Sequence, residues 1–147
     1  METRISRNIN ASPETVFRYI DEEDKIKLWI PELVANEFPH GKPKENPVGT
    51  KFIQKLKEGG RVRSYEGEVT AYEKNRALSI RLGNKGFTVD VDYRVEPQGS
   101  GSRLDFTCKV QYKSWFFGLM GKLFSGFMVK VANKQMDQLK EAAEQGK

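Results

Sequence analysis

The sequence predicts an α+β fold in which a curved antiparallel sheet of about seven strands wraps around a long C-terminal helix. Three observations lead to this prediction: a strand that runs into a capped helix near the N-terminus, alternating apolar residues from Leu33 to Tyr112, and helical periodicity from Trp115 to about Glu144. The 147 residues are enough to bury one hydrophobic core. We therefore expect residues 1–147 to form a single domain.

The first strand leads directly into a helix. Ile9 ends a short alternating run, and Ser12 can accept a hydrogen bond from a free amide of the first helical turn. Pro13 follows at a position where a helix tolerates proline well. A second short helix is predicted from Asp21 to Lys27, before Trp29-Ile30-Pro31, because proline disfavours helical backbone in the residue that precedes it.

Six further strands follow, with turn residues between them at short intervals. The links are too short for parallel crossovers, so the strands are expected to be antiparallel. Charged residues alternate with the apolar ones, which indicates one solvated face and one face that needs a cover. The residues expected on the covered face are Val34, Asn36, Phe38, Phe52, Gln54, Leu56, Tyr65, Gly67, Val69, Ala71, Leu78, Ile80, Leu82, Phe87, Val89, Val91, Tyr93, Val95, Leu104, Phe106, Cys108, Val110 and Tyr112.

The cover is expected to be the C-terminal helix. Its first apolar stripe consists of Phe116, Met120, Phe124, Phe127 and Val131, and a second stripe, rotated to one side, consists of Ala132, Met136, Leu139 and Ala143. The rotation indicates a bend or different neighbours for the two halves. Three glycines at 118, 121 and 126 disfavour helix, so residues 115–125 are predicted to be a loop or a separate short helix, with the long helix beginning near Ser125.

Composition excludes several classes of protein. A single cysteine rules out an internal disulfide and a cysteine-rich metal site, and no nucleotide or metal motif is present. The net charge of +5 comes from scattered residues and gives no basic arm for nucleic acid. The N-terminus lacks the apolar core of a signal peptide, and no apolar run could cross a bilayer, so we expect a cytoplasmic protein without a cofactor.

The residue types that most often carry catalysis do not form a convincing site. His40 is the sole histidine and lies in a predicted loop, while Cys108 has no cation or histidine in its strand to activate it. Glu66 and Glu68 share the face opposite Tyr65, where solvated charge is expected. No catalytic residue is therefore proposed from the sequence.

Six short motifs follow one another along the chain. They are Ala11-Ser12-Pro13-Glu14-Thr15-Val16-Phe17, the spacing from Asp21 to Trp29-Ile30-Pro31, Pro47-Val48-Gly49-Thr50-Lys51-Phe52, Tyr65-Glu66-Gly67-Glu68-Val69-Thr70-Ala71-Tyr72, Gly101-Ser102-Arg103-Leu104 and Leu139-Lys140-Glu141. In this order they resemble the START-like (SRPBCC) superfamily. The chain is similar to its polyketide cyclase/dehydrase and lipid transport branch, which shares the helix-grip fold of birch-pollen-allergen-like proteins. The resemblance implies a cavity between the sheet and the C-terminal helix that binds a lipid, a polyketide-like molecule or another hydrophobic compound.

Three functions remain open at this point. The first is binding of a hydrophobic small molecule, with Gln54, Tyr65 and Tyr93 orienting it and Trp29 near the mouth of the cavity. The second is a polyketide cyclase or dehydratase, and the third is a protein-interaction module such as a chaperone cofactor. The apolar segment Trp115–Phe124 could be core, a lid, or a point of peripheral membrane contact. The expected ligand-binding residues are Trp29, Phe52, Gln54, Leu56, Tyr65, Val69, Leu78, Val89, Val91, Tyr93, Phe106, Cys108, Phe124 and Met128.

Overall fold

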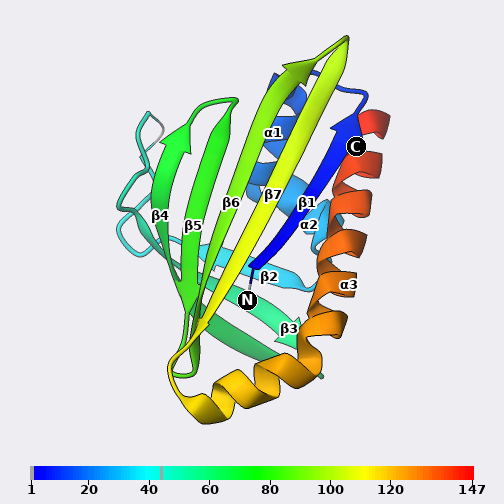
Figure 1. Cartoon of the computed structure of the whole chain (residues 1–147). Coiled ribbons are helices and arrows are strands. Elements are labelled where there is room, and N and C mark those ends of the chain that lie inside the picture. The colour runs from blue at the N-terminus through cyan, green and yellow to red at the C-terminus, as the bar shows by residue number, and fades with distance from the viewer. Residues whose placement is uncertain (1, 44) are drawn as a thin grey trace.

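The computed structural model describes residues 2–43 and 45–147, and for residues 116, 117, 120 and 122–124 it describes the backbone alone. Within these residues the elements are β1 (Glu2–Ile9), α1 (Pro13–Asp21), α2 (Glu23–Trp29), β2 (Leu33–Glu37), β3 (Lys51–Glu58), β4 (Arg61–Glu73), β5 (Ala77–Gly83), β6 (Phe87–Gln98), β7 (Gly101–Tyr112) and α3 (Trp115–Gln145). The predicted α+β class and helix-grip architecture are confirmed (Figure 1).

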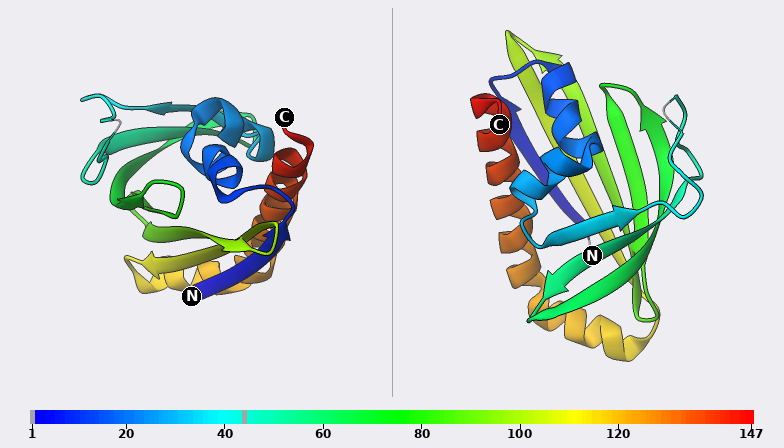
Figure 2. Two further views of the ribbon diagram at one scale, coloured as in Figure 1. Left: turned by 90° about the horizontal axis from the view of Figure 1, so that it is seen from above. Right: turned by 180° about the vertical axis from the view of Figure 1, so that it is seen from behind.

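In the described part of the chain, seven strands form one antiparallel sheet in the order β1-β7-β6-β5-β4-β3-β2. Seen from above, the sheet curls into a U, with α1 and α2 over its interior and α3 at the side where the edge strands β1 and β2 leave it open (Figure 2). The register places Tyr93 opposite Phe106 and Val91 opposite Cys108, so the period-two alternation predicted their shared face correctly.

The start of α1 follows the predicted capping chemistry. The hydroxyl oxygen of Ser12 accepts a hydrogen bond from the Thr15 amide at 3.2 Å, and Pro13 is the first helical residue. Val16, Phe17 and Ile20 are then buried in the core, where they belong to one cluster with β6, β7 and α3. The capped helix therefore fixes one end of the curved sheet.

A bulge in β4 changes the expected face of two residues. The pairing of β4 with β5 shifts between Val69 and Ala71, so that Tyr72, and not Ala71, lies opposite Leu78. The prediction that Ala71 faces the core was therefore wrong, because an extra residue in one strand reverses the alternation beyond it. Tyr72 instead packs against Phe17, with ring centroids 5.7 Å apart.

The C-terminal segment forms one helix, where a loop or a separate short helix was predicted for residues 115–125. Trp115–Gln145 forms one helix that bends, so that its first part crosses one end of the molecule and the rest runs beside β1 (Figure 1). The sequence holds Ser125-Gly126 in this region, and Gly/Ser pairs are a common cause of helix bends. The glycine at 121 also lets the helix pass close to Tyr112, whose ring leaves no space for a side chain there.

The two predicted stripes of α3 have different surroundings. Met136, Leu139 and Ala143 of the second stripe are buried, whereas Phe127 and Val131 of the first stripe are exposed. The expectation that the first stripe covers the sheet was wrong for these two residues, and Phe116, Met120 and Phe124 lie outside the described side chains. Arg7 of β1 fixes the rotation of α3 about its axis. Its guanidinium donates hydrogen bonds to the side-chain oxygens of Asp137 at 2.8 Å and of Asn133 at 2.9 Å.

Candidate functional site

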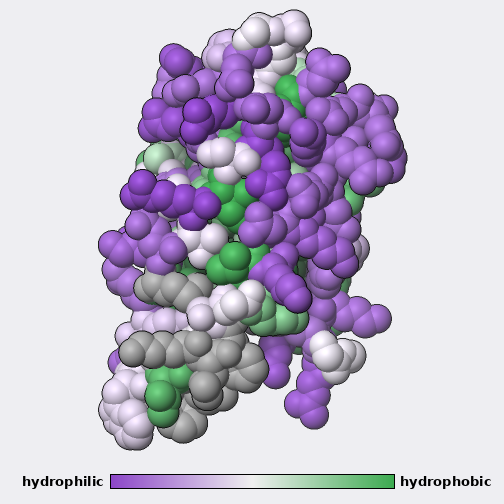
Figure 3. Space-filling view, turned by 45° about the vertical axis from the view of Figure 1, so that its right-hand side comes forward, coloured by the Kyte–Doolittle hydropathy of each residue, from purple (hydrophilic) through white to green (hydrophobic). Residues whose placement is uncertain are grey.

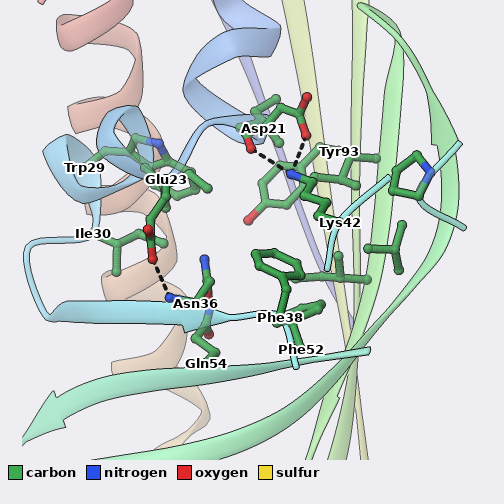
Figure 4. A pocket seen from close by; sticks show the side chains of 16 residues that line it. Asp21, Glu23, Trp29, Ile30, Asn36, Phe38, Lys42, Phe52, Gln54 and Tyr93 are labelled. Atoms are coloured by element: carbon green, nitrogen blue, oxygen red, sulfur yellow. Dashed lines mark hydrogen bonds and ion pairs between the residues drawn. The ribbon is translucent and has the colours of Figure 1, made fainter. Parts of the chain in front are cut away.

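A cavity of about 220 Å³ lies between the α1–α2 pair and the concave face of the sheet (Figure 4). The strands β2 to β6 form its walls, and the loop between β2 and β3 borders it through Lys42 and Pro47. Most of the lining is aliphatic or aromatic. The lining residues are Ile20, Asp21, Glu23, Ile26, Trp29, Ile30, Asn36, Phe38, Lys42, Pro47, Phe52, Gln54, Val69, Leu78, Ile80 and Tyr93.

Asp21, at the end of α1, ties three elements together beside the cavity. Its carboxylate accepts a hydrogen bond from the Tyr72 hydroxyl at 2.9 Å and pairs with the Lys42 ammonium at 3.1 Å. Lys42 also bonds the backbone oxygen of Asp21 and lies 5.5 Å from the centre of the Phe38 ring. Burial, together with the nearby Asp21 carboxylate, raises the pKa of Tyr72 to about 12. The phenol therefore stays neutral and donates to Asp21 at any physiological pH.

A second polar group lies at the junction of α2 with β2 and β3. A carboxylate oxygen of Glu23 accepts a hydrogen bond from the backbone amide of Asn36 at 2.5 Å. The side-chain oxygen of Asn36 in turn accepts from the Gln54 amide at 3.2 Å. Gln54 is buried on the inner face of β3, so these contacts satisfy part of its hydrogen-bonding capacity.

Tyr93 supplies a polar atom of a different kind. It is 9% exposed, packs edge-on against Trp29 with ring centroids 6.2 Å apart, and makes a tilted contact with the Phe106 ring at 5.5 Å. Its hydroxyl points into the space enclosed by the labelled side chains and makes no hydrogen bond with any of the residues drawn (Figure 4). Burial, and to a lesser degree Cys108, raises the pKa of this phenol, so it remains a neutral donor and acceptor.

Trp29 closes the inner end of the cavity and does not stand at its mouth. The residue is 1% exposed, and its indole N–H donates to the backbone oxygen of Tyr19 at 2.6 Å. The prediction that Trp29 lies near the mouth was wrong, because the ring is buried and its hydrogen bond holds it on α1. The indole contributes an apolar surface to the cavity, with its one donor already occupied.

Phe52 and Phe38 form an aromatic pair on the wall opposite α2. Their ring centroids are 5.7 Å apart, and Phe52 is 6% exposed. Gly67 lies beneath the Phe52 ring, where an added Cβ would come within 2.4 Å of Cζ. The position of this ring therefore depends on the absence of a side chain at Gly67.

A model of the polyketide cyclase/dehydrase and lipid transport family matches residues 2–144. The chain belongs to this family. No curated protein shows significant sequence similarity to it.

Solved structures share the fold at low sequence identity. TTHA0849 from Thermus thermophilus is 20% identical with a TM-score of 0.74 over 97% of both chains. Ara h 8.0201 is 15% identical with a TM-score of 0.65, over 95% of this chain and 97% of that one. The di-domain ARO/CYC StfQ from the steffimycin biosynthetic pathway is 12% identical with a TM-score of 0.76, over 98% of this chain and 51% of StfQ.

The cavity of this family member differs in place from the one expected from the sequence. Its lining comes from α1, α2, the sheet and the β2–β3 loop, and includes no described residue of α3. Trp29 lines the cavity and belongs to the same core cluster as Met136 and Leu139 of α3. The structure brings together six of the expected ligand-binding residues: Trp29, Phe52, Gln54, Val69, Leu78 and Tyr93.

The other expected residues with described side chains do not line this cavity. Val91 and Phe106 are buried in the core, and Leu56, Val89, Cys108 and Met128 are half-buried. The side chain of Phe124 lies outside the described part of the chain. Tyr65 donates to Glu58 at 2.5 Å, and burial together with that carboxylate raises its pKa to about 12.

The sequence analysis missed two carboxylates of the cavity, because Asp21 and Glu23 come from helix ends and not from the alternating strands. Asn36, Phe38 and Ile80 had been placed on the inner face, so their signal was present and they were left out of the site. Lys42 and Pro47 come from an irregular loop without a periodic signal.

The residues set aside as catalytic candidates lie away from the cavity. His40 is exposed in the β2–β3 loop, and burial raises the pKa of the half-buried Cys108 thiol, which disfavours a reactive thiolate. Glu68 pairs with Lys51 on the outer face, which lowers its pKa. Among the described residues, no group of three or more His, Cys, Asp or Glu side chains could hold a metal ion, and no helix combines the length and hydropathy needed to cross a bilayer.

Proposed function

We propose that the cavity between α2 and the sheet binds a compact, mainly apolar molecule that carries one uncharged hydrogen-bonding group. The volume of about 220 Å³ sets the size of this ligand. An apolar protein cavity of ~150 Å³ accepts benzene, so the space here suits a molecule of one or two rings, or the end of a larger one. The family supports this proposal, since it is described by lipid transport and by polyketide chemistry.

The hydroxyl of Tyr93 is the observation that carries the proposal. The hydroxyl is open to the cavity, since the one fully buried polar side-chain atom without a partner among the described residues is the Tyr112 hydroxyl. A ligand that accepts or donates a hydrogen bond at Tyr93 therefore takes the place of water there. The surrounding walls from Trp29, Ile30 and Phe38 offer apolar contact. One polar anchor in an apolar cavity is the usual design of a small-molecule site.

The charges around the cavity favour a neutral ligand. Asp21 is paired with Lys42 and accepts from Tyr72, so neither charge of this pair is available to a ligand. Glu23 adds a further negative charge, held by the Asn36 amide. An anionic ligand would therefore lose its hydration beside a carboxylate without gaining a free cation, which disfavours carboxylates and phosphates.

Two aromatic probes of matched shape test the proposal. 2-Acetylnaphthalene presents a neutral ketone, and 2-naphthoate presents a carboxylate on the same rings. We expect the ketone to bind in calorimetric titration and the carboxylate to bind at least tenfold more weakly. The ketone should also compete with any molecule that native mass spectrometry finds bound to the purified protein. Binding of the two probes with equal affinity would contradict the charge argument, and failure of both would contradict the proposed ligand class.

Substitution of Tyr93 locates the site within the molecule. The Tyr93→Phe variant keeps the ring and removes the anchor, so the affinity for the ketone is expected to fall about three- to tenfold, the equivalent of one hydrogen bond. Tyr65→Phe is the matched control, because its hydroxyl is bonded to Glu58 outside the cavity and its loss should leave ketone binding unchanged. Equal effects of the two substitutions would place the ligand elsewhere.

A cyclase or dehydratase is the second candidate, and the carboxylates of Asp21 and Glu23 favour it. They line the same cavity as the free phenol of Tyr93, so a proton acceptor and a hydrogen-bond donor for a carbonyl oxygen are both present. StfQ, a protein of similar fold, is named as an ARO/CYC from a biosynthetic pathway. If the chain catalyses such a reaction on a ketone substrate, Glu23→Gln should abolish turnover while ligand binding persists.

A further inference from the structure

The first half of α3 has an apolar side that faces outward in the described structure. Its four most exposed apolar side chains are Trp115, Leu119, Phe127 and Val131, with exposed fractions of 81%, 55%, 67% and 38%. Most exposed residues of a soluble protein are polar, and one helix with several large exposed apolar residues is unusual. We call this set of four residues the outer stripe of α3.

The outer stripe lies opposite the side of the helix that packs on the core. The core-facing side consists of Met128, Ala132, Met136, Leu139 and Ala143, which are half-buried or buried. At 100° per residue these five, which follow the bend, fall within an arc of about 80°, and Phe127 and Val131 lie about 140° and 100° from its centre. Val129, which is 37% exposed, lies about 60° from that centre. Phe127 could not reach the sheet without a rotation of the helix that would break the Arg7 contacts to Asn133 and Asp137, whereas Trp115 and Leu119 precede the bend and belong to the stripe by their exposure.

Lysines are the only charged residues around the outer stripe up to residue 136. From residue 106 to residue 136 the sequence contains five lysines and no aspartate or glutamate, and the next acid, Asp137, is paired with Arg7 of β1. Lys113, Lys130 and Lys134 are exposed, and Lys130 lies between Phe127 and Val131 in the sequence. On the side of the molecule that carries α3, hydrophobic surface emerges in small patches among hydrophilic side chains (Figure 3).

We propose that the outer stripe and its lysines form a surface that docks onto anionic membranes. An exposed helix with Trp, Phe and Leu on the same side as lysines is the pattern of a segment that lies in a membrane interface. The aromatic and aliphatic side chains enter the boundary between headgroups and acyl chains. The lysine ammonium groups remain at the level of the lipid phosphates.

The same charges disfavour a second copy of the chain as the occupant. A twofold interface would place the outer stripe of one molecule against that of another, because both partners use the same surface. Lys130 and Lys134 would then face like charges on the partner, and the nearest acid of the helix, Asp137, is already paired with Arg7. An anionic lipid surface satisfies both the apolar and the charged part of the stripe.

Vesicle sedimentation tests the proposal on the full chain. One set of vesicles consists of phosphatidylcholine alone and the other of an equal mixture of phosphatidylcholine and phosphatidylserine. We expect the protein to sediment with the mixed vesicles at ~0.1 M salt, and to be released at ~1 M salt because the Debye length then falls to about 3 Å. No sedimentation with the mixed vesicles would overturn the proposal, as would binding that is insensitive to salt.

Trp115 provides a built-in reporter of insertion. The other tryptophan, Trp29, is already buried, so a blue shift of the tryptophan fluorescence on addition of mixed vesicles reports Trp115 entering an apolar environment. The Phe127→Ser variant should weaken vesicle binding about tenfold, while Val48→Ser, at an exposed loop residue, should leave it unchanged. A blue shift of the tryptophan fluorescence that appears without vesicles and grows with protein concentration would show that a second copy of the chain covers the outer stripe. That result would overturn the proposal.

Charge-reversal variants test how much the lysines of α3 contribute to vesicle binding. The double variant Lys130→Glu with Lys134→Glu should lower the partition onto mixed vesicles at least tenfold. The double variant Lys27→Glu with Lys74→Glu changes the net charge equally at exposed positions on α2 and on the β4–β5 turn. Equal losses for the two double variants would show a general charge effect and would overturn the assignment to α3.

Discussion

Replacement of Gly67 by alanine tests how the aromatic wall of the cavity is built. The backbone of Gly67 does not require glycine, since its φ is not positive, so the constraint comes from space alone. A Cβ at this position would lie 2.4, 2.5 and 2.8 Å from three atoms of the Phe52 ring, whereas ordinary contacts lie between 3.4 and 4 Å. The ring must therefore move by roughly 1 Å toward the cavity or toward Phe38.

The expected loss of stability follows from two opposing terms. Overpacking of this kind costs about 1–3 kcal/mol, and alanine recovers about 0.5–1 kcal/mol because glycine loses more backbone entropy on folding. The net expectation for Gly67→Ala is a loss of about 1–2 kcal/mol in the free energy of unfolding, which corresponds to a fall in Tm of roughly 2–8 °C for a chain of this size. Urea denaturation followed by circular dichroism measures this change.

A double-mutant cycle decides whether the Phe52 ring is the cause. Leucine at position 52 lacks the ring atoms that meet the new Cβ, so Gly67→Ala in the Phe52→Leu background should cost less than ~0.5 kcal/mol. Gly126→Ala serves as a control for glycine replacement, because nothing lies within 4 Å of the added carbon and alanine favours a helix by about 1 kcal/mol. The reasoning is refuted if Gly67→Ala is neutral in the wild-type background, or if its cost is the same after Phe52→Leu.

Three further predictions concern stability. Arg7→Met should lower the free energy of unfolding by about 1–2 kcal/mol in urea denaturation, because the Arg7 side chain is mostly buried and holds α3 on β1. Asp137→Asn should lower it by less, because the Asp137 side chain is exposed. Tyr112→Phe should leave stability unchanged or raise it by up to ~1 kcal/mol, since its buried hydroxyl has no partner among the described residues; a loss in thermal denaturation would contradict this. Tyr65 and Tyr72 have folded pKa values of about 12, whereas an ordinary tyrosine has a pKa of 10.0. Their neutral phenols therefore contribute fully to stability below pH 10, and this contribution declines as the pH rises toward 12. Absorbance titration measures the two pKa values, and alkaline unfolding measures the loss of stability.

Most of the sheet could be predicted from the sequence because strand geometry has a strict period of two. The alternation in β6 and β7 placed Tyr93, Phe106 and Cys108 on one face, and the observed register agrees. The same rule fails at β4, where one extra residue between Val69 and Ala71 reverses the alternation. A bulge leaves little trace in the sequence of a single chain, since it depends on how two strands pair.

The bounds of α3 could not be predicted from local preferences. Three glycines favoured a loop or a separate short helix before Ser125, yet one continuous helix begins at Trp115. At Gly121, an added side chain would overlap the Tyr112 ring, so the residue that disfavours helix locally permits close packing against β7. Tertiary contact of this kind outweighs a propensity cost of about 1 kcal/mol per glycine.

The candidate site was the least predictable part because its residues are distant in sequence. Phe52, Gln54 and Tyr93 lie on strands with a clear inner face and could be identified. Lys42 comes from an irregular loop, and Glu23 begins a helix of seven residues, so neither has a periodic pattern that shows its orientation. Their place in the cavity depends on how α2 and the β2–β3 loop pack over the sheet.

The bulge in β4 connects the register of the sheet to the border of the cavity. Without the shift after Val69, Tyr72 would point to solvent and Ala71 would face α1. With the shift, the Tyr72 hydroxyl reaches Asp21, and the same carboxylate holds Lys42 of the β2–β3 loop. A single extra residue in a strand therefore positions the carboxylate that anchors the loop. Since Lys42 is thereby occupied, the neutral polar groups left for a ligand are the hydroxyl of Tyr93 and the rest of the Gln54 amide, and this is why the charge of a ligand, more than its shape, should decide whether it binds.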